Sequence, residues 1–349
     1  MKTSNVSNLS IQNSMRLTIL QAQNELLKSQ TEVSTGQYAD TGSELGSRTS
    51  MSLDLTRESL RLQSLVSTNA TSTQRLESSQ EAMTVMSTAS QSLMDSLVAL
   101  KGSNDDSNLQ VATQSAANAF DSFLSMANTS VSGEYLFSGI NTDVQPLVDA
   151  ETFMTDFEAT FQGHFGFAST DDVQVATIDA TQMEDFLTNI VEPMFMDAGG
   201  TWETDWSTAT DDVMMSRISQ SETVQTSTTV NSTGMRSLAY AAVVSQGLLG
   251  LNLQEDVRSV VSNNAIEATG RATSGIDRER TQLGLSQERV EATNESLEIQ
   301  QDIIENNFTS MVEVDAYEAS TRVNNLLSLV EASYTLTAKI QQLSLVNYL

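Results

Sequence analysis

The chain has 349 residues, of which 17 are Lys or Arg and 45 are Asp or Glu, so its formal net charge is -28. This charge excludes nucleic acid and anionic membrane surfaces as partners, because both are bound through basic surfaces. The absence of Cys excludes disulfides, thiolate nucleophiles and iron–sulfur ligation. Two Pro and 5% aromatic residues argue against a β-sandwich or a β-barrel.

The apolar residues are spread thinly along the chain. They make up 39% of it, and no run approaches the roughly 18 consecutive apolar residues of a membrane span. The first residues, MKTSNVSNLSIQNSMRL, also lack the apolar core of a cleaved secretory signal. We therefore expect no membrane span, and export by a route that does not use such a signal.

The N-terminal segment predicts an amphipathic helix that ends before Gly36. Its apolar residues recur at helical spacing and form one narrow stripe. The stripe consists of Ile11, Met15, Ile19, Ala22, Leu26 and Val33.

The stretch from Ser47 to Lys101 predicts a long helical rod. It contains neither Gly nor Pro, and about 55 helical residues would span roughly 80 Å. Apolar residues recur in it at heptad spacing, diluted by Ser and Asn, which predicts a seam against a second helix. The seam is formed by Leu62, Leu65, Leu76, Met83, Met86, Leu93 and Leu97.

The middle of the chain differs from both flanks. No Lys or Arg occurs between Lys101 and Arg217, while about twenty Asp and Glu do. Both Pro, both Trp, most Phe and the single histidine, His164, lie in the same region. This composition predicts a compact, acidic inserted domain of mixed structure, with His164 in a loop or a strand.

A second rod follows the insert. Glycines from Gly234 to Gly284 are expected to precede it, because Leu285 to Leu349 contains neither Gly nor Pro. Its heptad positions are Ile276, Leu283, Val290, Leu297, Ile304 and Met311. The apolar stripe shifts phase near Val314, which indicates a boundary between two packing layers. The stripe continues as Leu326, Leu329, Val330, Leu336, Ile340 and Leu343.

These patterns predict a mainly α fold. We expect an elongated helical rod of long N- and C-terminal coiled-coil-like helices, with a small mixed α/β or β-rich inserted domain. The expected segments are an N-terminal inner-core helix, 1–40; two halves of the helical rod domain, 41–140 and 225–313; an acidic, aromatic-rich outer insert, 141–224; and a C-terminal inner-core helix, 314–349, that pairs with the first.

The two terminal stripes are too small to stabilise a pair of isolated helices, because ordering each residue costs on the order of 1.5 kcal/mol. We expect both ends to become ordered only when neighbouring copies cover their stripes. Repeated identical subunits joined by heterologous contacts are the expected assembly.

Catalysis and ligand binding have little support in the sequence. His164 has no carboxylate partner at a spacing that implies a catalytic triad, and the acid pairs such as Asp171–Asp172 do not match a calcium loop. No phosphate-binding glycine motif occurs. We expect a protein that is not an enzyme and has no catalytic residues, cofactor or metal.

Three segments resemble the flagellin superfamily. They are GEYLFSGINTDVQPL, which contains Tyr135, Leu136, Phe137, Ser138 and Gly139; RERTQLGLSQERVEATNESL; and the C-terminal run from Val314 that ends in SLVNYL. The resemblance covers roughly 1–148 and 225–349. Flagellins carry an N-S-A-K-D-D-A-A-G run, whereas QYADTGSELGSRTSMSLDL stands at that place here.

This departure favours a member that forms the hook–filament junction over one that forms the filament. The resemblance implies a secreted subunit of the bacterial flagellum, exported by the flagellar type III pathway and located at that junction. Its implied partners are its own copies in a ring, hook-associated protein 1, flagellin, and an export chaperone that binds the C-terminal region.

Three other interpretations stay open. The chain could be a flagellin-type filament subunit. It could be a coiled-coil signalling or binding module, although the sequence has no membrane span to accompany one. It could carry a hydrolase in the insert, although the absence of Lys and Arg there and the single His argue against that reading.

Overall fold

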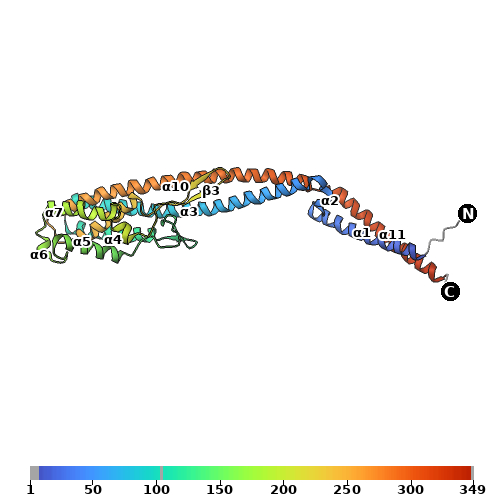
Figure 1. Ribbon diagram of the computed structural model, residues 1–349, viewed down its shortest axis with the longest axis horizontal. Coiled ribbons are helices and arrows are strands. Elements are labelled where there is room, and N and C mark those ends of the chain that lie inside the picture. Colours follow the sequence, from blue (N-terminus) through green and yellow to red (C-terminus); the bar gives the residue numbers. More distant parts are fainter. Residues whose placement is uncertain (1–7, 103–104, 347–349) are drawn as a thin grey trace. The chain divides into compact units, whose positions relative to one another are not determined.

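The computed structural model describes residues 8–102 and 105–346 and is built mainly of helices (Figure 1). It divides into two compact units, 1–64 with 296–349 (unit 1) and 65–295 (unit 2). Two long helices, α3 (Thr49–Gly102) and α10 (Glu255–Val312), contribute residues to both units. The predicted fold class, mainly α with long helices and a small insertion, is confirmed. The five expected segments are finer than this division and stay a prediction.

Unit 1 contains two helices near the ends of the chain that lie side by side (Figure 1), α1 (Asn8–Thr35) and α11 (Ala316–Val346). Between α1 and α3 lie α2 (Thr41–Leu45) and a short 3₁₀ turn, η1 (Gly46–Arg48). The helix α10 ends at Val312, close to the boundary predicted near Val314. The reason is a backbone junction, in which the Tyr38 N–H donates to the Val312 carbonyl at 3.0 Å and the Val314 N–H to the Gly36 carbonyl at 2.9 Å.

A new helix begins after this junction because Asp315 caps it. The Asp315 Oδ1 accepts hydrogen bonds from the N–H groups of Tyr317 and Glu318, at 2.8 and 3.2 Å. Such a carboxylate satisfies backbone donors that the first helical turn leaves unpaired. The phase shift of the apolar pattern near Val314 lies at this break.

In unit 2, α3 and α10 run antiparallel, and polar side chains join them across the seam. Gln80 Nε2 donates to Gln287 Oε1 at 2.6 Å, and Ser87 Oγ to Asp277 Oδ1 at 3.1 Å. Further along, Ser90 Oγ donates to the Thr269 carbonyl at 3.2 Å. At least one of the Ser residues that dilute the heptads, Ser90, therefore forms a hydrogen bond between the two helices.

Most of the glycines expected to precede the second rod lie inside helices, whereas Gly250 lies in the turn between two of them. Gly234 is in α9 (Thr233–Leu248), while Gly270, Gly275 and Gly284 are in α10. A Cβ at Gly275 would lie 2.5 Å from the Gly234 Cα, so the two backbones touch where α9 crosses α10. These two glycines serve close packing, and the second rod begins at Glu255, ahead of Gly270, Gly275 and Gly284 rather than after them.

The core of unit 2 is aromatic and joins the insert to its flanks. It includes α4 (Asp106–Ala127), α5 (Ala150–Phe165), α8 (Glu192–Met196), the π-helical turn η3 (Trp202–Trp206) and the almost entirely buried α9. The ring of Phe153 lies 5.4 Å from that of Phe120 and 4.5 Å from that of Trp206, and Phe195 lies 5.5 Å from Tyr240. The acidic insert thus shares its core with α4 and α9.

The insert has more helix than strand. Its remaining elements are α6 (Asp172–Val175), α7 (Ala180–Asp185), a π-helical segment η2 (Phe186–Val191) and an antiparallel hairpin of β3 (Met215–Arg217) and β4 (Thr223–Gln225), in which Ser216 pairs with Val224. A smaller hairpin, β1 (Ser130–Val131) with β2 (Glu134–Tyr135), precedes it. His164 lies in the last turn of α5, so its expected place in a loop or a strand is wrong.

Candidate assembly surface

The contact between α1 and α11 uses one face of each helix. On α1, Ala22 and Ser29 are buried, and Met15, Ile19 and Leu26 on the same face are half-buried. On α11, Ala319 and Val330 are buried. Gln23 Nε2 also donates to the Tyr334 hydroxyl at 2.8 Å, which joins the two helices at the edge of the contact.

The residues predicted for the inner layer are distributed unevenly over this surface. Ile11 and Leu326 are half-buried, whereas Val33, Leu329 and Leu336 are exposed, Leu336 to 47%. Ile340 and Leu343 lie in α11, but their side chains are outside the described residues. The pair therefore leaves part of the predicted stripe uncovered.

At the end of α1, Glu32 is buried, whereas its neighbour Val33, which was expected to be buried, is exposed. Glu32 is 5% exposed, its Oε1 accepts a hydrogen bond from the Ala39 N–H at 3.3 Å, and its Oε2 lies 3.5 Å from Arg322 Nη1. A buried carboxylate must be paired and hydrogen-bonded, and both conditions are met here. The buried face of α1 thus ends in a polar contact with the beginning of α11.

A second apolar row lies on the other side of α1 and was not identified from the sequence. Leu17, Leu20 and Leu27 are exposed, Leu17 and Leu27 to 62%. Each lies two residues, or roughly 200° around the helix, from a residue of the contact face. Their spacing of three and seven residues was visible in the sequence and could have identified the row.

On α11, apolar side chains flank the contact face on both sides. Leu327 and Tyr334 follow contact-face positions by one residue, and Leu329 and Leu336 precede them by one, and all four are exposed. We call these four residues together with Leu17, Leu20 and Leu27 the terminal apolar surface. Monomeric proteins rarely expose so many large apolar side chains on two neighbouring helices, so this surface is suited to contact with other subunits.

The predicted core of the rod is buried for most of its length. Six of the seven predicted α3 positions are fully buried or nearly so, as are Leu283, Val290 and Leu297 of α10, while Leu65 and Ile304 are half-buried. The buried α3 residues are Leu62, Leu76, Met83, Met86, Leu93 and Leu97. Each of the two long helices thus buries one stripe of its surface, as heptad spacing requires.

The motif from Tyr135 to Gly139 joins the two ends of the insert. The Phe137 carbonyl accepts a hydrogen bond from the Val230 N–H at 2.9 Å, and the Ser138 carbonyl accepts one from the Thr210 N–H at 3.1 Å. Leu136, Phe137 and Ser138 are fully buried. Gly139 has φ +70°, and a Cβ there would collide with the Thr210 carbonyl. This motif needs glycine at its end for both reasons.

Arg75 of α3 attaches this motif to the rod. Its Nη2 donates to the Tyr135 carbonyl at 2.8 Å, and its Nη1 lies 2.9 Å from Glu134 Oε2. Burial lowers the pKa of the Arg75 guanidinium from its usual value, and Glu134 partly offsets that effect. The ion pair therefore compensates a buried charge rather than adding much net stability.

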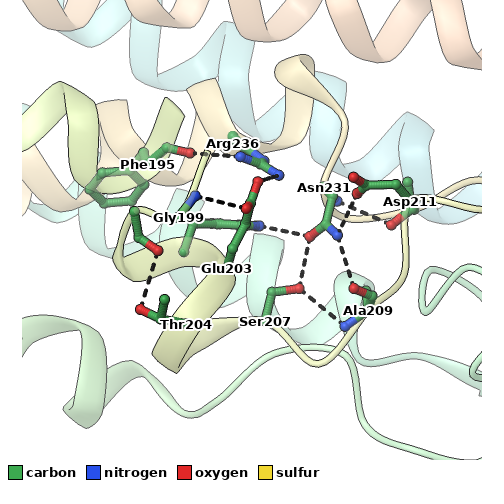
Figure 2. A network of polar contacts seen from close by, with 12 residues as sticks. Phe195, Gly199, Glu203, Thr204, Ser207, Ala209, Asp211, Asn231 and Arg236 are labelled. Atoms are coloured by element: carbon green, nitrogen blue, oxygen red, sulfur yellow. Dashed lines mark hydrogen bonds and ion pairs between the residues drawn. The ribbon is translucent and has the colours of Figure 1, made fainter. Parts of the chain in front are cut away.

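A polar network joins the segment from Phe195 to Asp211 with Asn231 and Arg236, as Figure 2 shows. Asn231 Oδ1 accepts from Trp202 Nε1 and Ser207 Oγ, each at 2.8 Å, and its Nδ2 donates to the Ala209 carbonyl at 3.0 Å and to Asp211 Oδ1 at 2.8 Å. All four hydrogen-bonding positions of this side chain are used. The Asn-Ser-Thr sequence that starts at Asn231 is therefore part of the packed structure.

Arg236 and Glu203 form the other half of this network (Figure 2). Arg236 is 7% exposed, and its Nη2 lies 3.1 Å from Glu203 Oε1, while Glu203 Oε2 accepts from the Gly199 N–H at 2.9 Å. The Gly199 hydrogen bond first, and Arg236 second, hold the pKa of Glu203 below its usual value. Both contacts stabilise the ionised carboxylate.

The single histidine lies apart from the polar networks described above. His164 is exposed and lies against the rings of Phe165 and Phe186, at 4.8 and 5.3 Å. Within residues 8–102 and 105–346, no group of three acidic or histidine side chains is placed to hold a metal ion. Over the same ranges, no helix has the length and apolar character needed to cross a membrane.

Two family models match the chain on either side of the insert. The bacterial flagellin N-terminal helical region matches residues 6–142, and the bacterial flagellin C-terminal helical region matches residues 266–349. Together they cover more than half of the chain. The chain belongs to the bacterial flagellin family. It is therefore an exported structural subunit of the bacterial flagellum, and the terminal apolar surface lies in the parts that the family shares.

Several solved structures resemble the fold of this flagellin-family subunit. One of them is described as "Structure of putative flagellar hook-associated protein from Vibrio parahaemolyticus", with a TM-score of 0.52 and 13% identity over 76% of this chain and 97% of that one. At this identity the likeness concerns the fold alone. No curated protein matches the sequence.

Proposed function

We propose that this flagellin-family subunit is hook-associated protein 3, which forms the ring between the hook-associated protein 1 layer and the flagellin filament. Two features of the chain support this assignment over a filament role: the sequence from Gln37 to Leu55 departs from the flagellin pattern, and the C-terminal region ends in SLVNYL. The solved structure with a similar fold is described as a hook-associated protein. The proposed role is structural and not enzymatic.

The observation that carries the proposed assembly is the terminal apolar surface. The pairing of α1 with α11 covers one face of each helix and leaves the seven large side chains of the terminal apolar surface exposed. Apolar area of this kind contributes about 25 cal/mol for each Å² removed from water. In the proposed ring, neighbouring copies cover this surface laterally, and hook-associated protein 1 and flagellin cover it axially.

Before assembly the same surface needs protection from non-specific association. We propose that an export chaperone binds α11 through the exposed Leu327, Leu329, Tyr334 and Leu336. The chain would then be delivered to the flagellar type III pathway in an unassembled state. Substitution of Leu329 and Leu336 by Ser should weaken chaperone binding, whereas the same change at Leu17 and Leu27 of α1 should leave it intact.

The strongest alternative is a flagellin-type filament subunit, which the family assignment supports equally. Antibody labelling of isolated flagella by electron microscopy separates the two. A junction subunit places gold only where the filament meets the hook, whereas a filament subunit places it along the whole filament. A coiled-coil signalling module would label neither position.

Deletion of the gene gives the functional test. We expect cells that retain hooks, lack filaments and release flagellin into the medium, with filaments restored by the intact gene. Normal filaments in the deletion strain would contradict the junction role. Loss of the filament protein itself, with another protein labelled at the junction, would favour the filament role.

A further inference from the structure

A fully buried amide interrupts the apolar seam of α3 in unit 2. Asn69 is 0% exposed, and the seam positions that follow at seven-residue intervals, Leu76 and Met83, are apolar and equally buried. Polar groups at such positions cost stability, and in coiled coils they specify which segments pair and in which register. The contacts of Asn69 show what it could specify here.

The Asn69 side chain connects three segments of the unit. Its Nδ2 donates to the Ile218 carbonyl at 3.0 Å and to Asn294 Oδ1 at 2.7 Å. Ile218 follows β3 in the hairpin turn, and Asn294 lies in α10. Because a backbone carbonyl can only accept, it is the NH₂ group of Asn69 that faces Ile218, and both of its hydrogens are used.

The other end of the amide has no partner. Asn69 Oδ1 is buried and accepts no hydrogen bond from the described residues. A buried acceptor without a donor is destabilising, so Asn at this position is not the choice that gives the most stable seam. A Leu would remove the unpaired oxygen and continue the row of Leu76. The hydrogen bonds to Ile218 and Asn294 are what Asn provides and Leu cannot.

The hairpin turn also has contacts of its own. Ile218 is fully buried and its N–H donates to the Glu222 carbonyl at 3.0 Å, a bond within the turn itself. A polar contact with α10 joins Arg289 Nε to Glu222 Oε1 at 3.8 Å, and the Arg289 side chain is 66% exposed. Exposed pairs of this kind contribute little. At the base of the hairpin, Thr228 Oγ1 donates to Glu279 Oε2 of α10 at 2.9 Å, and in Figure 1 β3 lies alongside α10.

We propose that Asn69 is a positioning residue that clasps the turn 218–222 onto the α3–α10 pair and fixes the axial register of the two helices. A shift of α3 against α10 by one turn would break the hydrogen bonds to both Ile218 and Asn294 and would bury an unpaired amide. Ile218 is itself fully buried in the core of unit 2, so a displaced turn would also expose an apolar side chain.

Two substitutions in the purified full chain distinguish an effect on the position of the turn from an effect on the stability of the whole chain. Asn69→Leu removes the unpaired oxygen but also leaves the Ile218 carbonyl without its donor, so the two effects oppose each other and the melting temperature should change little. Asn69→Asp also removes the donor but places a carboxylate against the Ile218 carbonyl, so the melting temperature should fall. If Asn69 holds the turn in place, the backbone amide hydrogens of 215–225 should exchange with solvent about five- to tenfold faster in both variants than in the unaltered chain. This is the change expected for one lost buried hydrogen bond.

Trypsin gives an independent readout of the same event. Arg217 is the only Lys or Arg between Lys101 and Arg236, so cleavage after it yields a fragment that begins at Ile218 and that mass spectrometry identifies. We expect this fragment to form faster in both variants. Ser79→Ala is the matched control, because Ser79 is a buried seam residue whose Oγ donates only to the Arg75 carbonyl of its own helix.

Two results would overturn the proposal. In one, the amides of the turn exchange as slowly in Asn69→Leu as in the unaltered chain, so that the exchange rate simply follows the melting temperature. In the other, Ser79→Ala opens the turn as much as the Asn69 variants, so that any polar seam residue has the same effect.

Discussion

At the scale of single residues, the family motif gains its conformation from Gly139. This residue has φ +70° and lies against the carbonyls of Thr210 and Asp212, at the place where the two ends of the insert meet. Gly133, in the turn between β1 and β2, also has a positive φ, +86°, but has no atom within 4 Å of a Cβ position. The two glycines thus share a left-handed backbone conformation, which Gly adopts without strain, and differ in surrounding space.

This difference makes a matched pair of substitutions. Gly133→Ala should lower the free energy of unfolding by about 1 kcal/mol, the strain of Ala at positive φ. Gly139→Ala adds a collision with fixed backbone and should cost more than about 2 kcal/mol. Urea unfolding of both variants measures the values, and equal losses would contradict the close packing at the motif.

The pKa of Glu203 predicts a second residue-scale effect. A carboxyl whose pKa is lowered in the folded state, here from 4.5, stabilises the protein above that value and loses its contribution as the pH falls through the lowered pKa. Glu203→Gln should therefore make unfolding less dependent on pH between about pH 5 and pH 3. Glu184→Gln, at an exposed acid of α7, is the control and should keep the original dependence. An unchanged pH profile in Glu203→Gln would rule out the ionised contact.

At the scale of the helices, glycine has two opposite roles in α10. Gly275 touches Gly234 where α9 crosses, whereas Gly270 has open space around its Cβ position. A glycine inside a helix weakens it unless close packing requires it. The sequence does not distinguish the two cases, because both read as possible helix ends.

Substitution by Ala should have opposite signs at these positions. Gly270→Ala should raise the free energy of unfolding by up to about 1 kcal/mol, through helix propensity alone. Gly275→Ala should lower it by about 1–3 kcal/mol, because the new methyl group forces α9 and α10 apart. Thermal unfolding of the two variants is sufficient. A stabilising Gly275→Ala would show that the helices do not cross there as closely as described.

The same comparison shows which elements could be predicted. Heptad spacing identified the seam of α3 from Leu62 to Leu97 because period and burial agree over many turns. The end of α10 at Val312 lies close to the boundary predicted near Val314, whereas its start at Glu255 was not predicted, because Gly275 is inside the helix through a contact with Gly234, which is distant in sequence. The burial of Glu32 rather than Val33, and the exposure of the row that includes Leu17, depend on how α11 packs against α1. The apolar pattern of α1 alone does not give that packing.

At the scale of the whole molecule, charge opposes compaction. With a net charge of -28, like charges repel over much of the surface, and salt screens them. The melting temperature at neutral pH should rise between about 20 mM and 500 mM NaCl. Near the isoelectric point of about 4.1 the same change of salt should have little effect. A melting temperature independent of salt at neutral pH would contradict this view of the acidic surface.

The terminal apolar surface is the other property of the whole molecule, since its function depends on neighbours. Hydrogen exchange of the full chain, measured on the dilute monomer and on assembled flagella, tests it most directly. We expect the amides of 8–35 and 316–346 to exchange rapidly in the monomer and slowly after assembly, while the amides of α4 and α9 stay protected in both. Equal protection of the two terminal helices in the dilute monomer would contradict an assembly surface that is completed by other subunits.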